Sequence, residues 1–428
     1  MRSWRELLAS KWLIPGMGVK RWLLLLVAGV TCLSLGVAYI LVELYREAPL
    51  PRIFYYLTLQ FLARELRALL FGSVGLGIVG YAVYHLNRSL LTVFLRPGQD
   101  NLADLVYQHR QRARGPHVVA IGGGTGLSSL LRGMKEHSAN LTAIVTVADD
   151  GGSSGRLRRE LGVLPPGDFR NCIAALADAE PLMTELFQYR FPEGQGLDGH
   201  AFGNLFIAAM VGVTGNFERA IAESSRVLAV RGRILPSTLE HVTLCAEIAD
   251  VGDGARHVEG ESQIPLSGHP IERVYLEPSG VRADTQALRA ILQAEMIILG
   301  PGSLYTSVLP NLLVDEVAQA IRVSAALKVY VCNVAIQPGE TDGYTVEDHV
   351  RAIEEHVGPG LVDVVVANSN MEVPSGNWKL ELVRPIYAWQ DRIPIVFEDL
   401  TDPKSPWRHD PAKLARCLLG LLARFRGQ

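Results

Sequence analysis

The sequence is poor in cysteine and has no excess of basic residues. Its five cysteines, among 428 residues, lie far apart and never form a C-x-x-C pair. That spacing excludes both a disulfide framework and a zinc cluster of paired cysteines. The chain has 41 lysines and arginines against 44 aspartates and glutamates, and beyond residue 100 the counts are 30 and 39. Because broad nucleic-acid binding needs a basic surface, no nucleic-acid partner is expected.

Two common nucleotide-binding motifs are also missing. No glycine-rich run is followed by the Gly-Lys-Ser/Thr of a Walker loop, and the run Gly122–Gly126 lacks the last glycine of G-x-G-x-x-G because position 127 is leucine. The first absence excludes a Walker-type phosphate loop. The second weakens the case for an NAD-binding dehydrogenase, which rests on fold analogy alone.

The first hundred residues hold two long apolar runs. Trp22–Tyr45 carries a single charge, at Glu43, and Ala68–Leu86 carries none. Each run is long enough to cross the ~30 Å hydrocarbon core of a bilayer. A cleaved signal peptide would have a shorter apolar stretch and a small-residue cleavage site. Two transmembrane helices that form a hairpin are therefore expected.

Two spans return the chain to the side of the membrane on which it began. We expect a membrane hairpin over residues 1–100, with spans at about 22–45 and 68–86, then a linker over 101–115 and a large domain over 116–428. Because that domain has the features of an intracellular nucleotide-binding protein, the expected location is the cell membrane, multi-pass, with the C-terminal domain in the cytoplasm. The sequence leaves homo-oligomerisation open.

Beyond residue 115, short apolar runs alternate with amphipathic stretches. The apolar runs are 117–121, 141–148, 274–276, 296–299, 328–332 and 361–367, and the helical stretches are 127–137, 283–295, 308–324 and 346–356. Strands that are apolar throughout and separated by helices indicate an α/β fold with a mostly parallel sheet covered on both faces. Residues 241–264 alternate around a glycine-rich turn, which predicts a small antiparallel excursion.

The first candidate binding motif is IGGGTG, residues 121–126, between a predicted strand and a predicted helix. Glycines permit positive φ and a close backbone approach, and the free N–H groups of a helix N-terminus attract phosphate. The motif predicts contact with a phosphate or nucleotide. The alternative is a tight turn that serves only packing.

Two adjacent carboxylates, Asp149 and Asp150, end the second predicted strand within ADDGGSSGRLR. Asp149 follows Gly126 by 23 residues, near the spacing at which an acid holds the ribose hydroxyls in dinucleotide folds. The pair also suits Mg²⁺, which takes carboxylate and water oxygens. A solvated turn is the third interpretation. The flexible loop that follows, which contains Ser153, suits closure over a phosphate.

Further motifs follow predicted strands or open predicted helices. In LPPGDFRN, Asp168 is a candidate helix cap and Arg170 is a functional candidate. In HAFGNLF, Asn204 is either a cap or a ligand. Residues 300–303, GPGS, form a second glycine corner at the carboxyl end of a strand, where open sheets bind ligands. Asn333 ends another strand.

Taken with their flanks, these motifs are long and specific. They read GGGTGLSSLLRG, TAIVTVADDGGSSGRLR, LPPGDFRN, GNLF, SRVLAVRGRILPST, GPGSLYTSVLPNL and CNVAIQPGETDGYTVEDH. In these motifs the chain closely resembles the YvcK-like gluconeogenesis factors, which share a superfamily with the 2-phospho-L-lactate transferase CofD. The resemblance covers about residues 118–360, and PWRHDPAKLA, residues 406–415, is similar to the closing segment of that family.

The resemblance implies a Rossmann-like fold that binds a nucleotide-linked ligand. YvcK-like proteins are associated with UDP-sugars such as UDP-N-acetylglucosamine, with growth on gluconeogenic carbon sources and with cell shape. The resemblance therefore implies a membrane-tethered, UDP-sugar-binding regulator of envelope precursor synthesis. The alternative is a CofD-like transferase that moves a phospholactyl-type group from a nucleotide donor with Mg²⁺. Whether the chain is an enzyme stays open, and no catalytic residue or certain cofactor is assigned.

Carried over by motif, the resemblance implies a ligand site drawn from the glycine corners, the strand ends and the C-terminal segment. Its residues are Gly123, Gly124, Thr125, Gly126, Asp149, Asp150, Ser153, Asn204, Ser303, Tyr305, Asn311, Asn333 and Arg408. The two adjacent aspartates are also the candidate Mg²⁺ ligands. Residue patterns alone support the glycine corners and the carboxylates, and they are silent about Asn311 and Arg408.

Overall fold

The computed structural model of the chain describes residues 28–32, 34–38, 42, 52–57, 59, 61–92, 110–178, 181–192, 196–249, 255–372, 381–385 and 392–427. The chain divides into two compact units, Met1–Gln111 and Arg112–Gln428. The predicted linker contains the boundary between the units, and its residues 101–109 lie outside the described residues.

Helices α3 (Arg52–Leu57) and α4 (Arg64–Thr92) belong to the first unit. About half of the predicted span Trp22–Tyr45 lies outside the described residues, and its described residues 28–32 and 34–38 are helical. The predicted span Ala68–Leu86 lies within α4. No single helix in the described ranges is both long and apolar enough to cross a membrane. The predicted transmembrane hairpin therefore remains a prediction.

The second unit is built on a seven-stranded sheet in which every pair of neighbouring strands is parallel. Its strands are β1 (Val118–Gly122), β2 (Leu141–Val145), β3 (Arg233–Pro236), β7 (Met296–Leu299), β8 (Leu327–Val331), β9 (Val364–Asn368) and β10 (Ile395–Glu398). The order across the sheet is β10-β9-β8-β7-β1-β2-β3. Strands β1, β2, β7 and β9 are buried at every position, as expected for a sheet covered on both faces. The predicted α/β class is confirmed.

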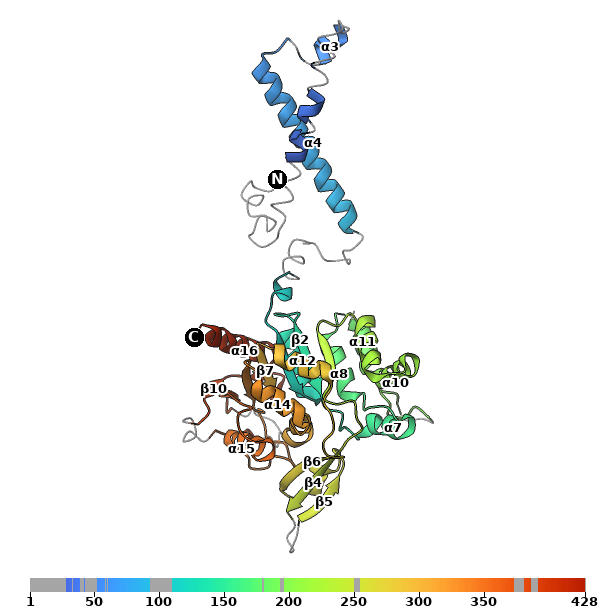
Figure 1. The fold of residues 1–428 in the computed structure, drawn as a ribbon, viewed down its shortest axis with the longest axis vertical. Helices are drawn as coiled ribbons and strands as arrows, with labels where there is room; N and C mark the ends of the chain where they lie inside the picture. The colour runs from blue at the N-terminus through green and yellow to red at the C-terminus, as the bar shows by residue number, and fades with distance from the viewer. Residues whose placement is uncertain are drawn as a thin grey trace. The chain divides into compact units, whose positions relative to one another are not determined.

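Helices cover both faces of this sheet (Figure 1). They are α6 (Gly124–Met134), α7 (Gly152–Leu161), α8 (Gly167–Leu176), α9 (Pro181–Gln188), α10 (Phe202–Thr214), α11 (Phe217–Val227), α12 (Thr285–Gln293), α13 (Leu309–Leu312), α14 (Asp315–Val323), α15 (Val346–Val357) and α16 (Pro411–Arg426). Helix α6 packs against α8 and α16, and α12 packs against α14. Together α10 and α11 are long and apolar enough for a membrane span, but the chain bends by 120° between them. Their residues Ile207 and Ile221 belong to the hydrophobic core of the unit.

Two small antiparallel sheets complete the unit. Strands β4 (Thr243–Ala249), β5 (Ala255–Glu259) and β6 (Ile271–Glu277) form the first, which confirms the predicted antiparallel excursion. The apolar run 274–276 was expected in the parallel sheet and lies instead in β6, because three apolar residues cannot distinguish the two kinds of strand. Strands β11 (Thr401–Asp402) and β12 (Ser405–His409) form the second.

The strand order creates a reversal between β1 and β7. From β1 the chain proceeds to β2 and β3 on one side, and β7 to β10 follow on the other. In open α/β sheets the crevice outside the carboxyl ends of the strands at such a reversal is where ligands bind. Both glycine corners begin there, because one follows β1 and the other follows β7.

Candidate functional site

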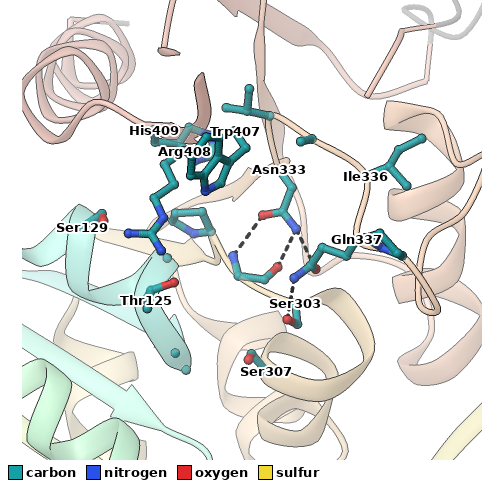
Figure 2. A pocket seen from close by; sticks show the side chains of 18 of the residues that line it. Thr125, Ser129, Ser303, Ser307, Asn333, Ile336, Gln337, Trp407, Arg408 and His409 are labelled. Atoms are coloured by element: carbon teal, nitrogen blue, oxygen red, sulfur yellow. Dashed lines mark hydrogen bonds between the residues drawn. The ribbon is translucent and has the colours of Figure 1, made fainter. Parts of the chain in front are cut away.

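A cavity of about 470 Å³ lies at the reversal between β1 and β7 (Figure 2). This volume is within the usual range for small-molecule sites. Its walls come from the two glycine corners, the loop after β8 and the C-terminal strand β12. The lining residues are Gly123, Gly124, Thr125, Gly126, Ser129, Pro301, Gly302, Ser303, Ser307, Asn333, Val334, Ala335, Ile336, Gln337, Pro338, Glu381, Trp407, Arg408 and His409.

The first glycine corner leads from β1 directly into α6. Gly123 is the N-cap of α6, has extended backbone and offers no side-chain cap of its own. The carboxyl group of Asp168 interacts with the backbone N–H of Gly124 at this helix start. Gly124 has φ +63°, a conformation that favours glycine. The first turn of α6 therefore directs backbone N–H groups toward the cavity, and the helix dipole favours an anion there.

Close packing explains the other two glycines of this corner. A Cβ on Gly126 would lie 2.4 Å from the carbonyl oxygen of Pro301, so the two corners are in direct backbone contact. A Cβ on Gly123 would lie 2.4 Å from Oδ2 of Asp168. Both distances are too short for any side chain, so the glycines are needed for the approach of neighbouring chain segments as well as for any ligand.

Asn333 holds the second glycine corner in shape. Its Oδ1 accepts a hydrogen bond from Gly302 N at 3.2 Å, and its Nδ2 donates to Gly302 O at 2.9 Å and to Gln337 Oε1 at 3.1 Å. Gln337 Nε2 then donates to Ser303 Oγ at 2.7 Å (Figure 2). Both amide hydrogens of Asn333 are thus committed to the protein, so this residue shapes the cavity rim.

A buried carboxylate occupies the helix start that follows the second corner. Residues Leu304–Val308 form a π-helical turn. Glu340 Oε2 accepts from Tyr305 N at 3.3 Å, and Oε1 accepts from Thr306 Oγ1 at 3.0 Å. Burial raises the pKa of Glu340, although these hydrogen bonds oppose the rise. Glu340 therefore already occupies the helix start that follows the second corner.

Asn311 joins the two corners from behind. It is fully buried, and its Nδ2 donates to Gly122 O at 3.1 Å and to Ser307 O at 2.8 Å. The first acceptor ends β1 and the second belongs to the π-helical turn. Asn311 therefore fixes the relative position of the corners and does not itself reach the cavity.

The C-terminal strand β12 closes the cavity on the side of α6. His409 is buried, and its Nε2 lies 3.1 Å from Cys332 O at the end of β8. Burial lowers the pKa of His409 to about 4, so the ring is neutral at pH 7 and donates this hydrogen bond. The side chain of Arg408 extends toward Thr125 and Ser129 (Figure 2). Arg408 is the only lysine or arginine among the described lining residues.

A group of carboxylates lies on the other side of the first corner, toward β2. Asp149 Oδ1 accepts from Gly151 N, and Asp150 Oδ1 accepts from Ser262 N, each at 2.9 Å. Burial, together with the neighbouring Asp149, raises the pKa of Asp168 to about 6. Burial and repulsion by the surrounding carboxylates raise the pKa of Glu261 to about 8. Within the described part of the chain, no three or more His, Cys, Asp or Glu residues are arranged to hold a metal ion.

The structure brings seven of the predicted site residues to the cavity and separates six from it. The seven are Gly123, Gly124, Thr125, Gly126, Ser303, Asn333 and Arg408. The six that do not line the cavity are Asp149, Asp150, Ser153, Asn204, Tyr305 and Asn311.

Ser153, Asn204 and Tyr305, like the other three, have hydrogen-bond partners within the protein. Ser153 Oγ accepts from Asn204 Nδ2 at 3.1 Å and lies 3.0 Å from His200 Nδ1. The hydroxyl of Tyr305 meets that of Tyr344 at 2.7 Å. These hydrogen bonds therefore stabilise the protein around the site, and Ser153, Asn204 and Tyr305 do not line the cavity.

Sequence reasoning missed several lining residues. Ser129 follows the first glycine corner at helical spacing, and Ser307 follows the second. Gln337 lies four residues after Asn333, in a loop from which only Asn333 was predicted to belong to the site. Trp407 is adjacent to the predicted Arg408, and its neighbours in sequence gave no sign that it borders a cavity. The motif spacing was a usable signal for the two serines only.

The chain is similar in sequence and structure to several known proteins. The profile of the family 2-phospho-L-lactate transferase CofD matches residues 118–384. A putative gluconeogenesis factor from Nostoc sp. is 49% identical over 96% of this chain and 91% of its own length. The gluconeogenesis factor of Bacillus subtilis is 46% identical over 72% of this chain and 98% of its own. A crystal structure of a UPF0052 family member from Bacillus halodurans has a TM-score of 0.68 and 45% identity, and covers 72% of this chain and 99% of that one.

We predict that Asn311→Ala lowers stability. The substitution removes the donor to two carbonyls and should cost roughly 1–3 kcal/mol in the free energy of unfolding. Thr125→Ala is the matched control, because Thr125 is exposed and should change stability by no more than about 0.5 kcal/mol. Urea unfolding of the two variants and the wild type measures both effects. An Asn311→Ala chain as stable as the wild type would show that this amide does not join the corners.

We also predict a pH-dependent gain in stability for Glu261→Gln. Folding raises the pKa of Glu261 from 4.5 to about 8, so between these values the folded chain holds a proton that the unfolded chain has released. The stability of the wild type is therefore lost as pH rises through this window. Glu261→Gln should melt above the wild type at pH 8, with the difference shrinking toward pH 4.5. Glu272→Gln, on the exposed side of β6, is the control. Parallel melting curves for wild type and Glu261→Gln at all pH values would contradict the assignment.

Proposed function

The chain belongs to the family of the 2-phospho-L-lactate transferase CofD, with gluconeogenesis factors among its relatives, and from this premise we propose that it is a UDP-sugar-binding regulator. The regulated process is envelope precursor synthesis, and through it cell shape, during growth on gluconeogenic carbon sources. A UDP-sugar is the ligand that the resemblance to YvcK-like proteins implies.

The observation that supports a phosphate-bearing ligand is the pairing of the glycine-rich start of α6 with a single arginine. The N-terminus of α6 opens into the cavity, and Arg408 extends from β12 toward the same turn. Backbone N–H groups and a guanidinium together suit a diphosphate, because charge-assisted hydrogen bonds to phosphate oxygens are the strong ones. The cavity of about 470 Å³ leaves room beyond the phosphates for the rest of a nucleotide-sugar.

The carboxylates on the β2 side have a proposed role as accessory Mg²⁺ ligands. Asp149 and Asp150 supply two carboxylates, fewer than a complete protein site requires. Mg²⁺ is usually held by one or two carboxylates together with phosphate oxygens and waters, so the aspartates suit an ion that arrives with a diphosphate. When bound, Mg²⁺ would neutralise phosphate charge. Neither side chain lines the cavity, and each has one oxygen that accepts from a backbone N–H, Asp149 from Gly151 and Asp150 from Ser262.

The alternative function is a CofD-like transferase for a phospholactyl-type group. The observation that favours it is Asp168, a buried carboxyl whose pKa is raised to about 6 and which approaches the first glycine corner. A carboxyl with a pKa near neutrality is suited to general base catalysis. Regulation remains the preferred proposal, because Asp168 does not line the cavity and its oxygen faces Gly123 within the protein.

We propose that the N-terminal unit anchors the chain in the cell membrane. Several large apolar side chains of α4 are exposed, among them Leu69 and Leu76 at 73% and Ile78 at 63%. Exposed apolar surface of this extent on one helix suits a lipid environment. With both predicted spans in the bilayer, the C-terminal domain would face the cytoplasm.

Ligand binding is tested by calorimetric titration with UDP-N-acetylglucosamine. Arg408→Ala should weaken binding roughly tenfold or more, the loss expected for a charged hydrogen bond to phosphate. Arg416→Ala is the control, since Arg416 lies on α16 outside the cavity and should leave affinity unchanged. Binding should persist in EDTA. Equal affinity of wild type and Arg408→Ala would remove Arg408 from the site, and binding abolished by EDTA would favour the transferase.

Membrane anchoring is tested by thiol accessibility in intact cells. A cysteine placed at residue 3, and one placed between residues 101 and 109, should both resist a membrane-impermeant thiol reagent and react after permeabilisation. This outcome follows from two spans that return the chain to the cytoplasm. Labelling of either position without permeabilisation would refute the proposed topology.

A further inference from the structure

The cavity lining combines polar and apolar side chains. Near the start of α6 it includes Thr125, Ser129 and the guanidinium of Arg408. Its apolar side chains are Val334, Ala335, Ile336, Pro338 and Trp407. A diphosphate explains the polar group near α6 only, so the apolar side chains call for a second part of the ligand with a different character.

Packing holds the side chain of Trp407 in place. It packs against a small apolar cluster of Val334, Ala335 and Leu382 that is separate from the main core. The cluster is built by two chain segments that pair, because Ile336 N donates to Glu381 O at 2.9 Å and Val383 N donates to Val334 O at 3.1 Å. Trp407 is half-buried, so it has packing on one side while it lines the cavity on another.

The register of β12 couples Trp407 to Arg408. His409 anchors the strand through Cys332 O, and Thr401 of β11 pairs with His409 across the hairpin. These contacts fix the two residues that precede His409. The indole and the guanidinium therefore line the same cavity from one short segment whose position is fixed (Figure 2).

We propose that Trp407 is the stacking platform for the planar ring of the ligand, which in a nucleotide is the base, while Arg408 and the α6 N-terminus hold the phosphates. The inference rests on the proposed function, since it assigns another part of the same cavity. A large aromatic ring that is held by packing loses little conformational freedom on binding and suits a flat partner. Stacking on such a ring tolerates any base, so Trp407 selects for a ring-bearing phosphate over a phosphate without one.

Two variants separate an aromatic role from simple apolar cover. Trp407→Leu keeps an apolar side chain over Val334 and Ala335 and removes the ring, whereas Trp407→Phe keeps a ring. The full-length chain is titrated with UDP-N-acetylglucosamine, with UDP and with pyrophosphate. Trp407→Leu should bind both uridine compounds about tenfold more weakly than the wild type, and Trp407→Phe should retain most of the affinity. Pyrophosphate should bind all three proteins equally.

The outcomes distinguish this inference from the proposed function. Uridine compounds that bind Trp407→Leu as tightly as the wild type would overturn the stacking role alone, and so would an equal loss of pyrophosphate affinity. A wild type that binds none of the three compounds would overturn the proposed function and this inference with it. Tryptophan fluorescence serves if Trp407→Leu does not fold. UDP should quench the emission of the wild type and leave that of Trp407→Phe unchanged, and quenching that persists in Trp407→Phe would also overturn the stacking role.

Discussion

The direct backbone contact between the two glycine corners is the constraint on which the site depends. Gly126 and Pro301 approach so closely that no side chain fits between them, and Asn311 holds both corners by donating to Gly122 O and Ser307 O. The contact is possible because β1 and β7 are neighbours although almost two hundred residues separate them. Every wall of the cavity is positioned relative to this contact, including β12, which is tied to the end of β8 through His409.

Electrostatics then distinguish the two sides of the first corner. The π-helical turn after the second corner already interacts with Glu340. Arg408 adds positive charge on the cavity side of α6. The carboxylates Asp149 and Asp168 concentrate negative charge on the β2 side, where burial raises the pKa of each. The proposed phosphate therefore belongs on the side of Arg408.

Much of the fold could be predicted, because buried parallel strands and amphipathic helices have distinct periodicities. The glycine corners could be placed at the site because they follow strands that end at the same edge. Side-chain direction could not be predicted. Tyr305 and Asn311 belong to a motif that is typical of a binding loop, yet both are buried, Tyr305 in the π-helical turn and Asn311 in α13. The contact of Trp407 with the cavity could not be predicted, because its position depends on pairing between segments that are distant in sequence.

A crystal structure of the chain with UDP-N-acetylglucosamine and Mg²⁺ would show whether the crevice between β1 and β7 is the ligand site. If it is, diphosphate oxygens lie within hydrogen-bond distance of the backbone N–H groups in the first turn of α6 and of the Arg408 guanidinium, and the rest of the ligand lies inside the cavity. A nucleotide-sugar bound elsewhere, with the cavity between the glycine corners and β12 left empty, would contradict it.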